Sequence, residues 1–221
     1  MARKILNNGL VLNLDARETV SKNWLDLSGE QNKATLYNKP KYTEEDFGSY
    51  YFDGNDQYGR LPTDFIDTTK PITAFFVFRT VGKGVIFGQA AQFNYNESPG
   101  YVPALYVDSF GKLRYSFFWH AATDTKASEK AVNDGQIHVF AITTENGEQV
   151  AYLDGEQISI TNYTQDQYSS NYFYTLGVGR CENWADFPQN NHFNGNIYDV
   201  LFYNRKLSKK ELAQNYNALK R

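Results

Sequence analysis

The sequence predicts an all-β domain in which short strands pack as a sandwich and one helix follows them. Aromatic residues make up 16% of the 221 residues, with 17 Tyr and 16 Phe, and such residues favour strands. Roughly a dozen apolar runs are separated by turn residues about every 8–12 positions, a spacing typical of sandwiches. Near the C-terminus the apolar spacing becomes helical. We therefore expect one domain over residues 1–221, with the helix at about 208–220.

The first half of the chain holds strands bounded by turns that contain glycine. Leu10, Leu12 and Leu14 alternate along the first strand and are expected on one face of it. The Asp-Gly pair at 53–54 separates two aromatic segments, which is a hairpin signal. The run ITAFFVFR at 72–79 is the strongest strand predicted in the chain, because it is almost entirely aromatic and aliphatic.

Turn signals continue through the second half. Asn-Gly at 146–147 and Asp-Gly at 154–155 each separate two apolar runs, so three consecutive antiparallel strands are predicted over 136–160. His138 lies between two aliphatic residues of the first of these strands and is expected to be a hydrogen-bonded residue on the sheet face. The run 195–203 is apolar on both faces, which predicts a strand covered on both sides.

The last stretch predicts one amphipathic helix. Ser208 lies three residues before Glu211, which is the spacing of a capping box. Leu212, Tyr216 and Leu219 follow at helical spacing and form one apolar stripe. Isolated helices of this length are marginally stable in water, so we expect the stripe to pack on the strands.

The charges and the hydrophobic pattern exclude several classes of protein. Lys and Arg number 22, Asp and Glu number 25, and they are spread along the chain, so no basic patch indicates a nucleic-acid partner. No apolar run approaches the roughly 18 residues of a membrane-spanning segment, and the N-terminus lacks the apolar core of a signal peptide. Cys181 is the single cysteine, so no internal disulfide can form, and we expect a reducing cytoplasm.

Six short motifs are spread over nearly the whole chain. They are GLVLNLDA at 9–16, WLDLSG at 24–29, FDGNDQY at 52–58, YLDG at 152–155, GNIYDV at 195–200 and YNRKLS at 203–208. Their order and spacing resemble those of concanavalin A-like, laminin G-like domains found in bacteriophage structural proteins. The resemblance implies a two-sheet antiparallel jelly roll with a short C-terminal α-helix.

The same resemblance implies a non-enzymatic bacteriophage virion protein. Such a protein would decorate the capsid, form part of a head fibre or associate with the tail, with other virion proteins as its partners. It would assemble in the host cytoplasm, insert into no membrane and occur in many copies on the particle, so that weak contacts add up through avidity. Its loops would serve adhesion, with a host-surface or environmental glycan as a candidate ligand.

Two other functions stay open at this stage. The chain would also suit a free carbohydrate-binding lectin or adhesin. A glycoside hydrolase of this fold would carry carboxylates alternating on one strand, and a Glu-x-Asp-x-Glu run is absent. This third function is therefore disfavoured, and we assign no catalytic residue. No His or Cys pair has metal-ligand spacing, and no cofactor motif is found.

The loop at 181–192 has the composition of a sugar site, because it combines aromatic rings with amide side chains. A second loop, with Trp119, would join it. The same aromatics would also be explained as plugs at the edge of the core or as a protein–protein contact. The candidate ligand-binding residues are Asn183, Trp184, Phe187, Asn190, Asn191 and Trp119.

Calcium is the one metal that the sequence leaves open. Asp53, Asn55 and Asp56 supply oxygen atoms of the kind that calcium prefers. An Asx-Gly turn explains the same residues without a metal, and we favour the turn. We expect no other cofactor.

Overall fold

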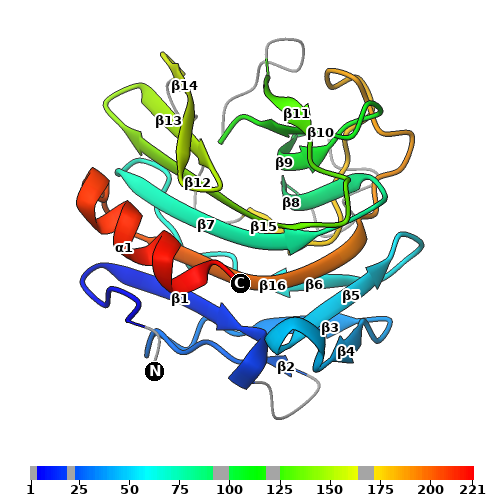
Figure 1. The fold of residues 1–221 in the computed structure, drawn as a ribbon, viewed down its shortest axis with the longest axis horizontal. Helices are drawn as coiled ribbons and strands as arrows, with labels where there is room; N and C mark the ends of the chain where they lie inside the picture. The colour runs from blue at the N-terminus through cyan, green and yellow to red at the C-terminus, as the bar shows by residue number, and fades with distance from the viewer. Residues whose placement is uncertain (1–3, 19–22, 92–99, 118–124, 164–171) are drawn as a thin grey trace.

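The structure is a computed structural model that describes residues 4–18, 23–91, 100–117, 125–163 and 172–221. Across these ranges the chain forms two antiparallel sheets of eight strands each, stacked face to face (Figure 1). One α-helix, α1 (Lys209–Leu219), lies across the outer side of one sheet. The all-β, two-sheet jelly roll with a C-terminal helix is therefore confirmed.

The sheet that carries the helix is called sheet A. Its strand order is β14-β13-β12-β7-β16-β5-β4, and β1 also pairs with β16. The strands are β1 (Leu10–Asp15), β4 (Lys41–Thr43), β5 (Ser49–Asp53), β7 (Ile72–Arg79), β12 (Ile137–Glu145), β13 (Glu148–Leu153), β14 (Glu156–Thr161) and β16 (Asn194–Tyr203).

The opposite sheet, sheet B, has the strand order β11-β10-β9-β8-β15-β6-β3-β2. Two short 3₁₀ helices, η1 (Ala16–Glu18) and η2 (Glu45–Phe47), lie in the connections near the N-terminus. The strands are β2 (Asn23–Trp24), β3 (Ala34–Tyr37), β6 (Tyr58–Leu61), β8 (Gly84–Ala90), β9 (Tyr101–Val107), β10 (Lys112–Tyr115), β11 (Lys126–Ala131) and β15 (Phe173–Leu176).

The Asp-Gly turn at 53–54 joins two strands that lie in different sheets. β5 pairs with β16 and β4, whereas β6 pairs with β15 and β3. The hairpin predicted there is wrong, because β5 and β6 each pair with two strands of their own sheet and not with each other. The turns at 146–147 and 154–155 do form the hairpins β12–β13 and β13–β14.

The space between the sheets is filled largely by aromatic rings. Phe76 of β7, Phe87 of β8 and Phe202 of β16 meet with ring centroids 5.3–5.7 Å apart. Full burial of one such side chain stabilises the fold by roughly 1.5–3 kcal/mol. The outer face of β7 is also buried, since Phe75 and Val77 lie under α1. Burial on both faces explains why this strand is apolar at almost every position.

A β-bulge in the first strand changes the face of one leucine. Leu10 pairs with Tyr203 and Leu12 pairs with Phe202. The chain therefore advances by two residues in β1 while it advances by one residue in β16, which leaves one extra residue in β1. Leu12 and Leu14 therefore enter the space between the sheets, while Leu10 joins the cluster under α1. The prediction that all three share one face is wrong for Leu10.

The helix begins with the predicted capping box. The Ser208 hydroxyl accepts a hydrogen bond from the Glu211 amide, and the Glu211 carboxylate accepts one from the Ser208 amide at 2.8 Å. Leu212 and Leu219 are buried against sheet A, and the buried Asn215 donates to the Tyr203 hydroxyl at 2.8 Å. With its 11 residues α1 is too short to span a bilayer, and across the described ranges no helix has the length and apolarity to do so.

A buried ion pair ties the end of the chain to the sheet. The Arg221 guanidinium lies 2.6 Å from the Asp199 carboxylate, and it also donates to the Asp46 carbonyl at 2.7 Å. The Arg221 side chain is 3% exposed and that of Asp199 is 0% exposed. Arg221 also covers the Tyr198 ring at 4.7 Å. These contacts connect α1, β16 and η2.

Candidate functional site

A concave polar surface lies on the outer face of sheet B. It is a groove of about 460 Å³ over strands β3 and β6 and the loops beside them. The side chains that line it are mostly polar and come from two short segments of chain, 31–37 and 60–64. They include Gln31, Lys33, Thr35, Tyr37, Arg60, Thr63 and Asp64.

The strand register puts these side chains on one face. Thr35 of β3 lies opposite Arg60 of β6, and Tyr37 lies opposite Tyr58. Successive residues of a strand point to opposite faces of the sheet. Leu61, the residue after Arg60, is accordingly buried between the sheets. The groove therefore uses the solvent face of strands whose opposite face builds the core.

Two aromatic contacts fix the groove side chains. The rings of Tyr37 and Tyr58 are stacked with centroids 4.7 Å apart and an interplanar angle of 6°. The Arg60 guanidinium lies over the Phe173 ring of β15 at 5.0 Å from its centroid. Burial raises the pKa of the Tyr58 hydroxyl above 10, the neighbouring Tyr37 adds to this, and Arg60 opposes it. The Tyr58 phenol therefore keeps its proton at neutral pH.

The groove offers an aromatic platform beside hydrogen-bonding groups. Tyr37 has restricted freedom because Tyr58 supports it, so ordering its ring on a ligand costs little entropy. Arg60 and Lys33 are donors, Asp64 is an acceptor, and the hydroxyls of Thr35 and Thr63 act as both. An aromatic ring with a few converging polar groups is the usual composition of a site for a small polar molecule.

The sequence-predicted loop at 181–192 contains a buried aromatic rather than an open one. Trp184 is 6% exposed and packs with the core residues, so its ring presents no open face to a ligand. Phe187 is half-buried and packs against the same core. Asn183 is exposed, with a left-handed backbone at φ 74°. Trp119 lies outside the described residues.

The two other amides of this loop hold its shape. The Asn191 side chain accepts a hydrogen bond from the Cys181 amide at 3.1 Å and donates to Glu182 at 2.8 Å. The Asn190 amide donates to the Gly54 carbonyl at 2.6 Å, across the gap between two loops. Ligand binding by the exposed amides of this loop stays a prediction, without the aromatic platform expected at Trp184.

The residues proposed for calcium form a turn. The Asp53 carboxylate accepts a hydrogen bond from the Asn55 amide at 2.9 Å, and Gly54 has a φ of 79°. This is the Asx-Gly turn that the sequence favoured. Across the described ranges no group of three or more His, Cys, Asp or Glu side chains is arranged to hold a metal ion. Calcium binding by Asp53, Asn55 and Asp56 stays a prediction.

The other titratable groups singled out in the sequence have structural partners. His138 lies 2.8 Å from Asp154 and 3.1 Å from Asp134. Burial by itself lowers the pKa of His138, but the hydrogen bonds and charges of both aspartates outweigh it and raise the pKa above 6.5. Burial also raises the pKa of the Cys181 thiol, which is 0% exposed, so the thiol stays protonated and unreactive.

Comparison with known families agrees with the fold. A laminin G-type family model, described as the Concanavalin A-like lectin/glucanases superfamily, matches residues 53–213. The chain belongs to this superfamily. Among curated proteins no sequence match was found.

Solved structures share the fold at low sequence identity. Trypanosoma rangeli sialidase in complex with the inhibitor DANA has a TM-score of 0.69 and 15% identity; the match covers 96% of this chain and 33% of the sialidase chain. The binding domain of Paraclostridial Mosquitocidal Protein 1 has a TM-score of 0.69 and 13% identity, with coverages of 96% and 52%.

A third similar structure matches over nearly its whole length. Domain 4 of AbnA, a GH43 extracellular arabinanase from Geobacillus stearothermophilus, was solved in complex with arabinotriose. It has a TM-score of 0.62 and 16% identity, and the match covers 94% of this chain and 98% of that domain. At these identities the likeness concerns the fold alone, which is of the carbohydrate-binding type.

The sheet B groove could not be found by motif search. Tyr37 and Arg60 are far apart in the sequence, and the antiparallel register of β3 and β6 brings them together. The available signal was weak: two alternating runs that each place a polar or aromatic residue on the face opposite the core.

Proposed function

We propose that this chain is a non-enzymatic binding module that recognises a glycan in the groove on sheet B. The observation that carries the proposal is the Tyr37 ring, held in place by its stack on Tyr58 and bordered by Arg60 and other polar side chains. A sugar ring has an apolar face that packs on an aromatic ring and hydroxyls that exchange hydrogen bonds with such neighbours. The groove supplies both kinds of contact.

One similar structure supports the choice of ligand. It is a domain in complex with arabinotriose, and it matches this chain over nearly its whole length. A second similar structure, which is named as a binding domain, supports a binding role without indicating a ligand.

The composition of the groove supports binding rather than turnover. Glycoside hydrolases generally need two carboxyl groups on either side of the scissile bond, about 5–10 Å apart. Asp64 is the one carboxylate among the residues that line the groove. A single acid supplies either the proton donor or the second carboxylate, and the reaction needs both.

A glycan array followed by titration calorimetry tests the proposal. We expect the wild-type protein to retain a saccharide. Tyr37→Ala should then weaken binding about tenfold, which is close to 1.4 kcal/mol, and Arg60→Met should weaken it as well. Phe110→Ala is the matched control, because Phe110 is 70% exposed in the β9–β10 turn, away from the groove. An array without a binder, or an equal loss in the control, would refute the proposal.

We further propose that the module is carried on a bacteriophage particle, in many copies and with other virion proteins as partners. This placement is supported by the sequence motifs that resemble domains of bacteriophage structural proteins. Many copies would turn weak saccharide contacts into firm adhesion. Mass spectrometry of purified particles tests the placement: the polypeptide should co-purify with the particle through a density gradient. Its absence from intact particles would remove the virion role and leave a free lectin.

A further inference from the structure

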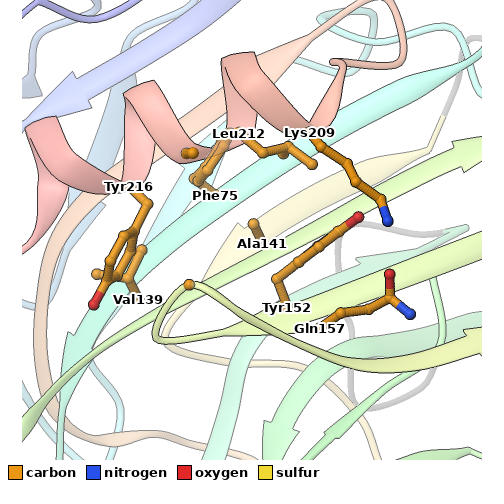
Figure 2. A pocket seen from close by; sticks show the side chains of 10 residues that line it. Phe75, Val139, Ala141, Tyr152, Gln157, Lys209, Leu212 and Tyr216 are labelled. Atoms are coloured by element: carbon orange, nitrogen blue, oxygen red, sulfur yellow. The ribbon is translucent and has the colours of Figure 1, made fainter.

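A second pocket lies on the opposite side of the molecule, between α1 and the outer face of sheet A (Figure 2). Its volume is about 230 Å³. Cavities of roughly 150 Å³ lined by apolar side chains bind a molecule the size of benzene. The pocket therefore has room for a small molecule with an apolar body of about ten heavy atoms.

The pocket exists because small residues lie where the helix passes over the sheet. Ala141 of β12, Gly155 in the β13–β14 turn and Ala213 of α1 leave space between larger neighbours. Gly155 has a φ of 87°, and a Cβ atom there would lie 2.9 Å from the Tyr216 ring. This glycine lets the turn approach the helix and close one end of the pocket.

The walls of the pocket are apolar, and its polar groups gather at one end. Phe75 and Val139 form the floor, and Leu212 lines the helix side. In Figure 2 the Lys209 ammonium, the Tyr152 hydroxyl and the Gln157 amide lie together on one side, and they come from α1, β13 and β14.

The charges decide which ligand fits. Lys209 takes part in none of the ion pairs found among the described residues. Its neighbour Lys206 is compensated by Glu148 at 3.0 Å and Glu145 at 3.6 Å. At the other end, near Tyr216, the charges of Asp154 and Glu156 add to burial in raising the pKa of the Tyr216 hydroxyl. An anion is favoured beside Lys209 and disfavoured beside Tyr216.

We propose that this pocket binds a medium-chain carboxylate, such as octanoate. The carboxylate would accept hydrogen bonds from Lys209 and Tyr152, and the alkyl chain would lie over Ala141 toward Tyr216. This site is separate from the sheet B groove, and it does not rest on the glycan-binding proposal.

Titration calorimetry and methyl NMR on the full chain test the site, with sodium octanoate as the probe. We expect saturable binding at millimolar concentration, with the largest shifts at the methyl groups of Ala141 and Leu212. Butanoate should bind more weakly because it fills less of the apolar space, and 1-octanol should bind more weakly because it lacks the charge. Absence of binding, or shifts confined to other parts of the molecule, would overturn the proposal.

Variants separate the charge from the cavity. Lys209→Gln should weaken octanoate binding about tenfold. Lys210→Gln is the matched control: it removes the same charge one position along the helix, from a residue that does not line the pocket. Ala213 lines the pocket, so the larger side chain of Ala213→Leu should occupy part of its volume and block octanoate and 1-octanol alike. An equal loss in the two lysine variants would overturn the specific role of Lys209. Tyr37→Ala should leave octanoate binding unchanged, whatever its effect on glycans.

Discussion

Replacing Arg221 with Met should destabilise the fold by about 3 kcal/mol. The substitution removes the guanidinium that neutralises Asp199, a carboxylate with 0% side-chain exposure. Removing one partner of a buried pair costs roughly 3–5 kcal/mol, because the other charge is left in a medium of low polarity. The lower end of this range applies because Asp15 lies opposite Asp199 and brings Arg17 close to it.

Urea unfolding followed by fluorescence measures this cost. With m near 2–3 kcal/mol/M for a chain of this size, the midpoint should fall by about 1 M at an unchanged slope. Lys210→Met is a change at an exposed helix position and should alter the free energy of unfolding by less than about 0.5 kcal/mol. The double variant Asp199→Asn/Arg221→Met should be more stable than Arg221→Met alone, since it also removes the buried negative charge of Asp199. A loss below about 1 kcal/mol in Arg221→Met would refute the reasoning.

Two further predictions concern single residues. Because folding raises the pKa of His138, its protonated form stabilises the fold below about pH 6.5, and this contribution is lost as the pH rises through the folded-state pKa. Thermal unfolding across this range should show the loss in the wild type and a flatter curve for His138→Asn; equal slopes would contradict it. Gly155→Ala should lower the melting temperature more than Gly29→Ala, because a Cβ at 155 meets Tyr216 at 2.9 Å while one at 29 meets nothing within 4 Å. Equal losses would contradict the proposed contact.

Features set by neighbouring residues were predictable from the sequence. The capping box of α1 depends on residues 208 and 211, and the turns at 146–147 and 154–155 depend on two residues each. The run 195–203 indicated burial on both faces through its composition alone, and β16 is buried along most of its length. In each case the physical cause lies within one turn or one strand, so a short window contains the signal.

Features set by long-range pairing were missed. The turn at 53–54 was recognised, but β5 pairs with β16 and β6 pairs with β15, two strands that lie far away in the chain. The bulge that turns Leu10 outward depends on its pairing with Tyr203. The sequence left a place at the edge of the core open as one explanation of Trp184, whereas the meeting of Tyr37 with Arg60 depends on the pairing of β3 with β6. Composition identified residue types suited to a sugar site, while register decided which of them share an open face.

The most direct test of the central claim is a crystal structure of the protein with the tightest-binding saccharide from the array. The account predicts an intact sugar over the Tyr37 ring, within hydrogen-bonding distance of Arg60. A saccharide bound at the 181–192 loop instead, or one cleaved between two carboxylates, would contradict it.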